Sequence, residues 1–339
     1  MKILITGIAG FVGRHLLSRI ADGNKIYKKD SKKGGILKRD DKILGVDLKI
    51  DNTAVKDLTN IFSEIDLQEV NLVVREKVYK VVEKFKPEKI YHLAAQSSVS
   101  YSWNNPVETM ETNVFGGLNI FNAVMKYCQL CKILVACTAE EYAGFNNFKN
   151  EAIKENFKIE PANPYAISKA AIDFFAATYY RVNRLPVYIS RSFNHIGPGQ
   201  SDRFVASDFA KQIVEIENGK IRPVMLVGNI EVYRDFLDVR DVVEAYCAIL
   251  EKGRAGEAYN VCSGIKRKIS DILDVLLSYS SVKNIEIKVD KSKMRPIDVI
   301  SIYGDNSKLK LHTGWKPEYD IKGSLKDTLN WWRERSKVN

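Results

Sequence analysis

Residues 2–21 have the sequence KILITGIAGFVGRHLLSRIA, in which a short apolar run leads through three glycines into a helical pattern. Glycines spaced in this way let the chain turn tightly and let its backbone approach a ligand closely. The N-terminus of the following helix favours an anion such as a pyrophosphate. The stretch therefore predicts a strand, a dinucleotide-binding loop and a helix. The residues of the loop expected to bind the cofactor are Gly7, Gly10, Phe11, Val12 and Gly13.

Short apolar runs alternate with longer amphipathic patterns through the first half of the chain, which is typical of βαβ units and a parallel sheet. We expect strands at residues 2–6, 43–47, 60–65, 89–94, 133–137 and 187–192. We expect helices at residues 12–21, 73–85, 107–126 and 165–182. Six strands with crossover helices predict an α/β fold with a Rossmann-type, doubly wound parallel sheet.

The pattern changes after about residue 195, where shorter elements are separated by loops that contain Gly, Pro and Arg. In this part we expect helices at residues 204–217 and 239–251 and a strand at residues 258–262. The sequence therefore predicts a Rossmann domain at residues 1–195 and a smaller C-terminal lobe at residues 196–339, with some exchange of chain between the two.

The composition is typical of a soluble globular protein. The chain has 339 residues, of which 45% are hydrophobic and 28% charged, so it can bury a core and is not disordered. It contains no apolar run long enough to span a bilayer and no N-terminal secretory pattern. We therefore expect a cytoplasmic protein without a membrane partner.

The net charge of +10 raises the question of a nucleic-acid partner. Half of this excess lies in residues 24–42, which contain eight Lys and Arg against three Asp. Tyr27 is the single aromatic residue there, whereas a nucleic-acid surface needs aromatic side chains that stack on bases. The segment therefore predicts a solvated loop and no nucleic-acid partner.

The five cysteines, an odd number, favour free thiols in a reducing compartment. Cys128 and Cys131 form a C-x-x-C pattern, which is found in zinc sites and in redox motifs. A zinc site needs a second pair of ligands, and no Cys or His pair has a matching spacing. We therefore expect ordinary thiols and no metal.

Two aspartates follow the expected second and third strands. Asp47 ends the second strand, where its carboxylate can accept hydrogen bonds from both ribose hydroxyls of NAD and would repel the 2′-phosphate of NADP. Lys49 and Arg39 are near enough in sequence to receive a phosphate, so NADP stays open as an alternative. Asp66 is expected at the end of the third strand, where it would meet the adenine.

Three residues farther along the chain suggest proton transfer. Tyr165 and Lys169 are four residues apart and therefore lie on one face of a helix. A cation beside a tyrosine lowers the pKa of the phenol toward working pH, which makes the phenol a usable proton donor and acceptor. Thr138 ends the expected fifth strand, where its hydroxyl can bind a substrate oxygen. Together with the glycine loop, this set predicts an oxidoreductase.

The chain resembles the extended short-chain dehydrogenase/reductase family, which includes nucleotide-sugar epimerases, dehydratases and reductases, almost from end to end. The resemblance is carried by the glycine loop, by the catalytic set Thr138, Tyr165 and Lys169, and by the segments at residues 92–95 and 113–116. It implies that the cofactor is NAD(H) or NADP(H). It further implies that the cofactor contacts Leu93, Ala94 and Ala95 and also Tyr165 and Lys169.

Within this family the chain is most similar to enzymes of GDP-linked hexoses, the GDP-4-keto-6-deoxy-mannose reductases among them. The similar segments are residues 192–201, 228–230, 234–236 and 295–296. The resemblance implies that the C-terminal lobe binds a GDP-sugar and that Asn194, Arg234 and Arg295 hold its diphosphate. Guanidinium groups suit this role because they bind phosphate oxygens in pairs.

The resemblance implies reduction of the C4 keto group of a GDP-linked 4-keto-6-deoxy sugar, as part of deoxysugar biosynthesis. Tyr165 would give a proton to the sugar oxygen, Lys169 would hold the ribose, and Thr138 would steady the oxygen. Glu140 leaves a GDP-mannose 4,6-dehydratase open as the alternative, because that enzyme uses a glutamate here to remove the C5 proton. Against it, the glycine loop lacks the Gln and Asp that those dehydratases carry. An epimerase, a sugar dehydrogenase and, remotely, a non-catalytic dinucleotide sensor also stay open.

Two of the expected helices carry more apolar side chains than one sheet face needs. These side chains are Met110, Val114, Leu118, Phe121, Phe174, Phe175, Tyr179 and Tyr180. In similar enzymes the corresponding helices pair across a twofold axis into a four-helix bundle. The resemblance therefore implies a homodimer.

Overall fold

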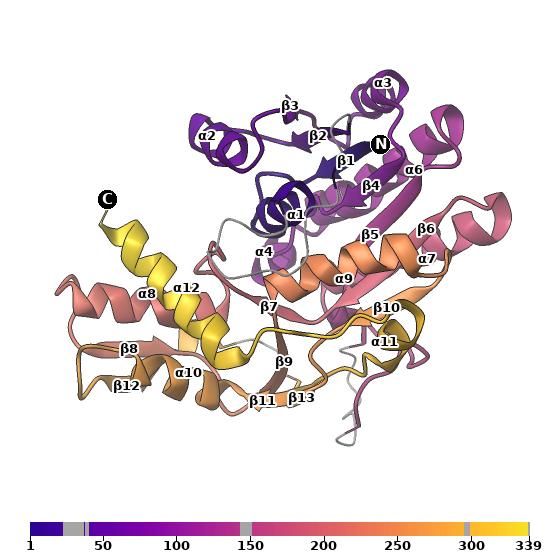
Figure 1. The fold of residues 1–339 in the computed structure, drawn as a ribbon. Coiled ribbons are helices and arrows are strands. Elements are labelled where there is room, and N and C mark those ends of the chain that lie inside the picture. The colour runs from indigo at the N-terminus through magenta and orange to yellow at the C-terminus, as the bar shows by residue number, and fades with distance from the viewer. Residues whose placement is uncertain (23–36, 38–40, 143–150, 295–298, 338–339) are drawn as a thin grey trace.

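A computed structural model describes residues 1–22, 37, 41–142, 151–294 and 299–337. The strands of its larger sheet are β1 (Lys2–Thr6), β2 (Lys42–Asp47), β3 (Asp66–Glu69), β4 (Lys89–His92), β5 (Lys132–Thr138), β6 (Val187–Ser192) and β10 (Ala258–Val261). All are parallel, and they lie in the order β10-β6-β5-β4-β1-β2-β3 (Figure 1). The strand order reverses between β1 and β4, which confirms the doubly wound Rossmann-type sheet.

Helices cover both faces of this sheet (Figure 1). They are α1 (Phe11–Asp22), α2 (Asn52–Ile61), α3 (Arg75–Phe85), α6 (Gly116–Tyr127), α7 (Pro164–Asn183), α9 (Val239–Lys252) and α11 (Ser307–Thr313). Side chains alternate between the two faces, as a strand requires. In β1, Ile3 and Ile5 share a buried cluster with α1 and α9, whereas Leu4 shares one with α3, α6 and α7.

Short helices and turns connect the strands and helices of the large sheet. They are α4 (Val99–Asn104), α5 (Pro106–Met110), the π-turn η2 (Glu111–Phe115) and the 3₁₀ turn η3 (Ala139–Tyr142). The single helix expected at residues 107–126 is therefore divided into α5, η2 and α6. Within η2, Asn113 donates a hydrogen bond to the Ser168 hydroxyl, 2.8 Å away, and so ties this segment to α7.

The smaller lobe contains the remaining elements. They are β7 (Asn194–Ile196), α8 (Val205–Glu217), β8 (Val224–Val227), β9 (Tyr233–Asp238), β11 (Lys266–Lys268), α10 (Ile269–Ser278), β12 (Glu286–Val289), η4 (Lys291–Lys293), β13 (Ser301–Ile302) and α12 (Ile321–Ser336). Helices α8, α10 and α12 pack around a third buried cluster that includes Phe209 and Phe236. The chain returns to the large sheet with α9 and β10, so β10 is a seventh strand of that sheet beside β6.

One expected strand is wrong. Residues 60–65 do not form a strand, because α2 continues to Ile61 and β3 begins at Asp66. The side chain of Asp51 explains the helix, since it accepts a hydrogen bond from Ala54 N at 2.7 Å and caps the first turn. Leu58 of α2 is then buried against the sheet.

Two buried histidines predict how stability depends on pH. Burial lowers the pKa of His15 to about 4 and that of His92 to about 3, from the usual 6.5. The unfolded chain therefore binds more protons than the folded protein below about pH 6.5, and the free energy of unfolding falls as the pH falls through this range. Each histidine should remove about 2 kcal/mol at about pH 5.

Urea unfolding at about pH 5 and about pH 7.5 checks this expectation. The His92→Gln variant should lower the contribution of the histidines to this difference by about 2 kcal/mol. A difference between the two pH values that His92→Gln leaves unchanged would contradict the assignment of His92 as buried and neutral.

In the part of the chain that the structure describes, no helix is long and apolar enough to cross a membrane.

Candidate active site at the carboxyl edge of the sheet

The glycine loop between β1 and α1 is built so that only glycine fits at two of its positions. Gly7 has a φ of +74°, and a Cβ atom there would lie 2.8 Å from the Ala94 nitrogen. A Cβ atom on Gly13 would lie 2.3 Å from the Gly7 oxygen. Helix α1 begins at Phe11, and its first turn carries no acidic side chain. The loop and the helix N-terminus therefore fit an anionic pyrophosphate.

The segment after β4 lies against this loop. The Ala94 nitrogen donates a hydrogen bond to the Thr6 hydroxyl at 3.2 Å, and the Leu93 nitrogen donates one to the Thr6 carbonyl at 3.2 Å. The expected cofactor residues Leu93, Ala94 and Ala95 therefore follow directly on the strand beside β1, at the same edge of the sheet as the glycines. Ligands of open α/β sheets bind at this edge.

Asp47 ends β2 beside the glycine loop. Its Oδ2 accepts a hydrogen bond from the Ala9 nitrogen at 3.0 Å, and its Oδ1 accepts one from the Leu48 nitrogen at 2.8 Å. Burial raises the pKa of Asp47, while the two backbone hydrogen bonds lower it. The carboxylate therefore lies beside the glycine loop, at the edge where ligands of open α/β sheets bind.

The expected position of Asp66 is wrong. In the register of β2 with β3, Asp47 pairs with Glu69 whereas Asp66 pairs with Leu44. Asp66 therefore begins β3 level with the middle of β2, and Glu69 is the residue of β3 that lies at the edge beside the glycine loop. The cause is the length of α2, which places the start of β3 where the sequence pattern suggested its end.

The three expected catalytic residues come together from β5 and α7. Thr138 is the last residue of β5, and Tyr165 and Lys169 lie one turn apart on α7. The Lys169 ammonium donates a hydrogen bond to the Ala136 carbonyl at 2.7 Å. Asn163 caps α7 by accepting a hydrogen bond from the Ala166 nitrogen at 2.8 Å, and this cap fixes the turn that carries the phenol.

The pKa of the Tyr165 phenol is higher than the sequence suggested. Burial raises the pKa of Tyr165 above its usual value, and the charge of nearby Glu140 raises it further, whereas a hydrogen bond with Thr138 lowers it. Burial also lowers the pKa of Lys169. The expected lowering of the phenol pKa by Lys169 is therefore wrong for this structure, because burial has the larger effect. A neutral phenol is a proton donor.

Glu140 lies in η3, close to the catalytic set. The side-chain nitrogen of Asn163 donates a hydrogen bond to Glu140 Oε2 at 3.3 Å. Sequence reasoning gave no role to Asn163, although an asparagine before a proline and a helical pattern is a recognisable capping signal. It also gave no role to Glu141, which is fully buried beside the site.

The residues expected to bind a diphosphate lie on neighbouring strands of the smaller lobe. Asn194 begins β7, and it pairs with Phe236 in β9, two residues from Arg234. Arg234 is buried, and its Nη1 donates hydrogen bonds of 2.8 Å to the carbonyls of Tyr233 and Val299. Arg295 lies outside the described residues, and so does most of the lysine-rich segment at residues 24–42.

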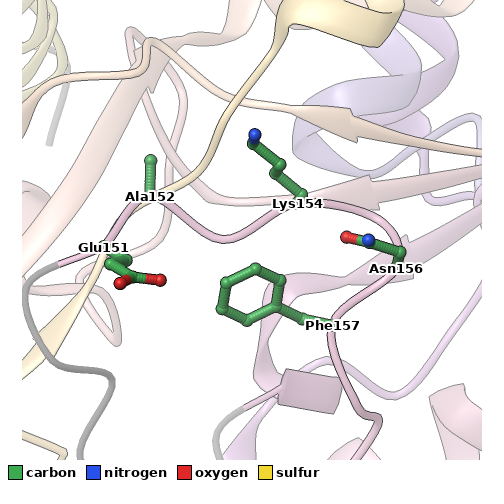
Figure 2. Close-up of a pocket in the computed structure, with 5 residues that line it drawn as sticks. All are labelled: Glu151, Ala152, Lys154, Asn156 and Phe157. Carbon is green, nitrogen blue, oxygen red and sulfur yellow. The ribbon is translucent and has the colours of Figure 1, made fainter.

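A cavity of about 440 Å³ lies in the segment between η3 and α7, and none of the expected site residues lines it. Figure 2 shows the five residues that line it, which all come from one short stretch of chain. They are Glu151, Ala152, Lys154, Asn156 and Phe157. The cavity is therefore separate from the set formed by Thr138, Tyr165 and Lys169.

Comparison with known proteins agrees with this geometry. The family model of GDP-mannose 4,6 dehydratase matches residues 4–328. The chain is 31% identical to GDP-6-deoxy-D-mannose reductase of Pseudomonas aeruginosa over 98% of both chains. It is 25% identical to dTDP-glucose 4,6-dehydratase of Haemophilus influenzae, again over 98% of both.

Solved structures show the same fold together with a cofactor. RMD from Pseudomonas aeruginosa complexed with NADPH has a TM-score of 0.80 and 30% identity, covering 98% of this chain and 99% of that one. UDP-glucose 4-epimerase of Thermus thermophilus complexed with NAD has a TM-score of 0.81 and 25% identity, with the same coverage. The chain therefore belongs to the GDP-mannose 4,6 dehydratase family, within the NAD(P)-dependent nucleotide-sugar enzymes of the short-chain dehydrogenase/reductase type.

Proposed function

We propose that this protein is a reductase that uses NAD(P)H to reduce the C4 keto group of a GDP-linked 4-keto-6-deoxy sugar. The observation that carries the proposal is the convergence of Thr138 at the end of β5 with Tyr165 and Lys169 on α7, at the edge of the sheet that holds the glycine loop. The similarity to a GDP-6-deoxy-D-mannose reductase along 98% of the chain supports the choice of substrate.

The chain's own residues account for binding and proton transfer. The glycine loop and Asp47 would hold the dinucleotide, whose nicotinamide, when bound, supplies the hydride. Tyr165 then gives its proton to the sugar oxygen as negative charge develops there, and the Thr138 hydroxyl stabilises the same oxygen. Lys169 would bind the nicotinamide ribose and keep a positive charge near the phenol.

The smaller lobe would bind the GDP-sugar. Asn194 and Arg234 lie on adjacent strands, and we place the diphosphate against them, with Arg295 as a third contact. A guanidinium group held by two backbone carbonyls loses little freedom when it binds phosphate.

An assay with purified protein tests the proposal. NADH or NADPH is mixed with GDP-4-keto-6-deoxy-mannose, and nicotinamide absorbance is followed before mass analysis of the sugar nucleotide. We expect a loss of absorbance and a product that is two hydrogens heavier. Loss of water from GDP-mannose in a parallel sample, without reduction of the keto sugar, would instead support a dehydratase in which Glu140 removes the C5 proton.

The position of Asp47 favours NAD(H) over NADP(H), because a 2′-phosphate would meet its carboxylate. We expect Asp47→Asn to raise the ratio of kcat/KM for NADPH to that for NADH by about tenfold, the effect of one charged hydrogen bond. The matched control is Asp66→Asn at the start of β3, three residues before the residue that pairs with Asp47, which should leave the ratio unchanged. A ratio that Asp47→Asn does not move would show that this carboxylate does not select the cofactor.

We also infer a homodimer that pairs the helices expected at residues 107–126 (α5, η2 and α6) and 165–182 (α7) with their copies in a four-helix bundle. Of the side chains expected at this interface, Val114 and Phe121 are buried inside the chain instead, whereas Phe174 and Phe175 are exposed. Val107 and Phe115 add exposed apolar surface, at 69% and 53%. Exposed apolar side chains of this size on neighbouring helices indicate a protein interface.

Sedimentation at micromolar concentration tests the dimer. We expect Phe174→Asp to shift the protein from dimer to monomer, because a carboxylate would have to be buried at the centre of the bundle. Val182→Asp, near the end of the same helix and also exposed, is the control. A monomeric wild-type protein would exclude this assembly.

The five free cysteines support a reducing, cytoplasmic location.

A further inference from the structure

Four buried polar side chains form a cluster directly behind the proposed catalytic residues. They come from four different elements, namely β5, η3, α7 and β6, and none is more than 7% exposed. The members of this cluster are Cys137, Glu141, Asp173 and Arg191. The cluster contains two carboxyl groups and one guanidinium, so the protonation of the carboxyls decides its net charge.

Arg191 donates four hydrogen bonds, two of them to Asp173. Its Nε and Nη2 donate hydrogen bonds to the two oxygens of Asp173, at 2.8 and 3.2 Å. Its Nη1 donates to the Tyr142 hydroxyl at 2.8 Å and to the Glu155 carbonyl at 3.0 Å. The separation between Arg191 Nε and Glu141 Oε2 is 3.6 Å, which is an ion-pair distance but too long for a hydrogen bond.

The two oxygens of Glu141 have different surroundings. Oε1 accepts a hydrogen bond from the backbone nitrogen of Thr138 at 3.1 Å. Oε2 is buried and accepts no hydrogen bond from any residue that the structure describes. One carboxyl oxygen of Glu141 lies within 4.8 Å of a carboxyl oxygen of Asp173, and the sulfur of Cys137 lies within the same distance of both. An ionised carboxylate would be costly in this position, whereas a proton on Oε2 can be donated to Asp173.

The electrostatics agree with this geometry. Burial and the charge of Asp173 raise the pKa of Glu141 well above its usual value, against the opposite effects of Arg191 and the Thr138 nitrogen. A metal ion is not needed to balance the cluster, because Arg191 already supplies a positive charge. Other titratable groups around Glu141 are Cys137, Tyr142, Glu155, Tyr165 and Lys169.

We propose that Glu141 is a positioning residue that acts as a neutral carboxylic acid, holding the backbone of Thr138 through Oε1 and donating its proton from Oε2 to Asp173. A negative charge on Glu141 would act on the phenol of Tyr165 and make its proton harder to remove. The neutral acid therefore supports Thr138 without placing that charge behind the phenol. The catalytic consequence rests on the proposed function, whereas the protonation of Glu141 does not.

Infrared difference spectroscopy of the whole protein tests the protonation directly. The spectrum of the wild-type protein minus that of Glu141→Gln should contain the carbonyl band of a protonated carboxylic acid at about neutral pH. Glutamine can replace the neutral acid, because its amide donates to Asp173 and its oxygen accepts from Thr138. We therefore expect Glu141→Gln to keep kcat/KM within about threefold, with an unchanged pH profile.

Asp173→Asn should change the pH profile of kcat/KM, which Glu141→Gln leaves unchanged. Glu141 is then the carboxyl group nearest to Arg191, so it should ionise, and the infrared band should disappear. The pKa that limits kcat/KM on the basic side of its pH profile (the basic limb) should rise by about one unit. Glu141→Ala is a second variant, in which loss of the contact with Thr138 should lower kcat about tenfold without moving the limb.

Absence of the infrared band in the wild-type protein would overturn the proposal, and so would a shifted limb in Glu141→Gln. A wild-type protein that shows the band but does not reduce the keto sugar would contradict the proposed function alone.

Discussion

Replacing Tyr165 by phenylalanine should lower kcat about 10³-fold and leave the affinity for NADH within about threefold. The variant removes one oxygen from a half-buried side chain at the start of α7, where that oxygen is hydrogen-bonded with Thr138. Without the phenol, the sugar oxygen has no proton donor as negative charge develops on it. Single-turnover absorbance measurements and a fluorescence titration with NADH would separate the two effects.

Tyr179→Phe is the matched control for this variant. Tyr179 lies on the same helix and donates a hydrogen bond to Asn122 at 2.9 Å, far along α7 from the site. We expect it to keep wild-type turnover, with a small loss of stability of about 1 kcal/mol. Turnover by Tyr165→Phe within tenfold of the wild-type rate would show that another group supplies the proton.

The Gly13→Ala variant should lose both the cofactor and much of its stability. The added methyl group would lie 2.3 Å from the Gly7 oxygen and 2.8 Å from Ile8 Cα, and both are backbone atoms that cannot move aside without distorting the loop. We expect a loss of about 3 kcal/mol in the free energy of unfolding and a rise of at least about 100-fold in the Kd for NADH. Urea unfolding and fluorescence titration measure these two quantities.

Gly10→Ala separates binding from stability. A Cβ atom there would lie 3.2 Å from the Gly7 oxygen, a tight but tolerable contact. Because the methyl group would occupy the surface where a pyrophosphate approaches the backbone, affinity for NADH should fall more than tenfold while the fold is kept. If Gly10→Ala bound NADH like the wild-type protein, the cofactor would not lie against this loop.

Local sequence patterns predicted the large sheet well, because each strand is a short apolar run between polar turns. β1 matches the expected residues 2–6, and β6 matches the expected residues 187–192. The pattern failed at residues 60–65, where an apolar run at the end of an amphipathic helix looks like a strand. It also could not assign the strand near residue 258 to the large sheet, since strand pairing depends on contacts across about 70 residues of chain.

The site was predictable where one motif determines both geometry and chemistry. The glycine loop, Asp47 and the set of Thr138, Tyr165 and Lys169 depend on short spacings within elements that the sequence places correctly. The effect of burial on the phenol was not predictable, because it depends on all the elements that surround the side chain. The role of Glu141 was hidden for the same reason, since its partner Asp173 lies on another element.

Transfer of deuterium from C4-deuterated NADH or NADPH to the sugar tests the central claim most directly. The purified protein is mixed with GDP-4-keto-6-deoxy-mannose and the labelled cofactor, and the product is analysed by mass spectrometry and NMR. The reductase mechanism predicts one deuterium bound to C4 of the product sugar, with Tyr165→Phe giving almost none in the same time. A product that carries no deuterium at C4, or a keto sugar that is not consumed, would contradict the account.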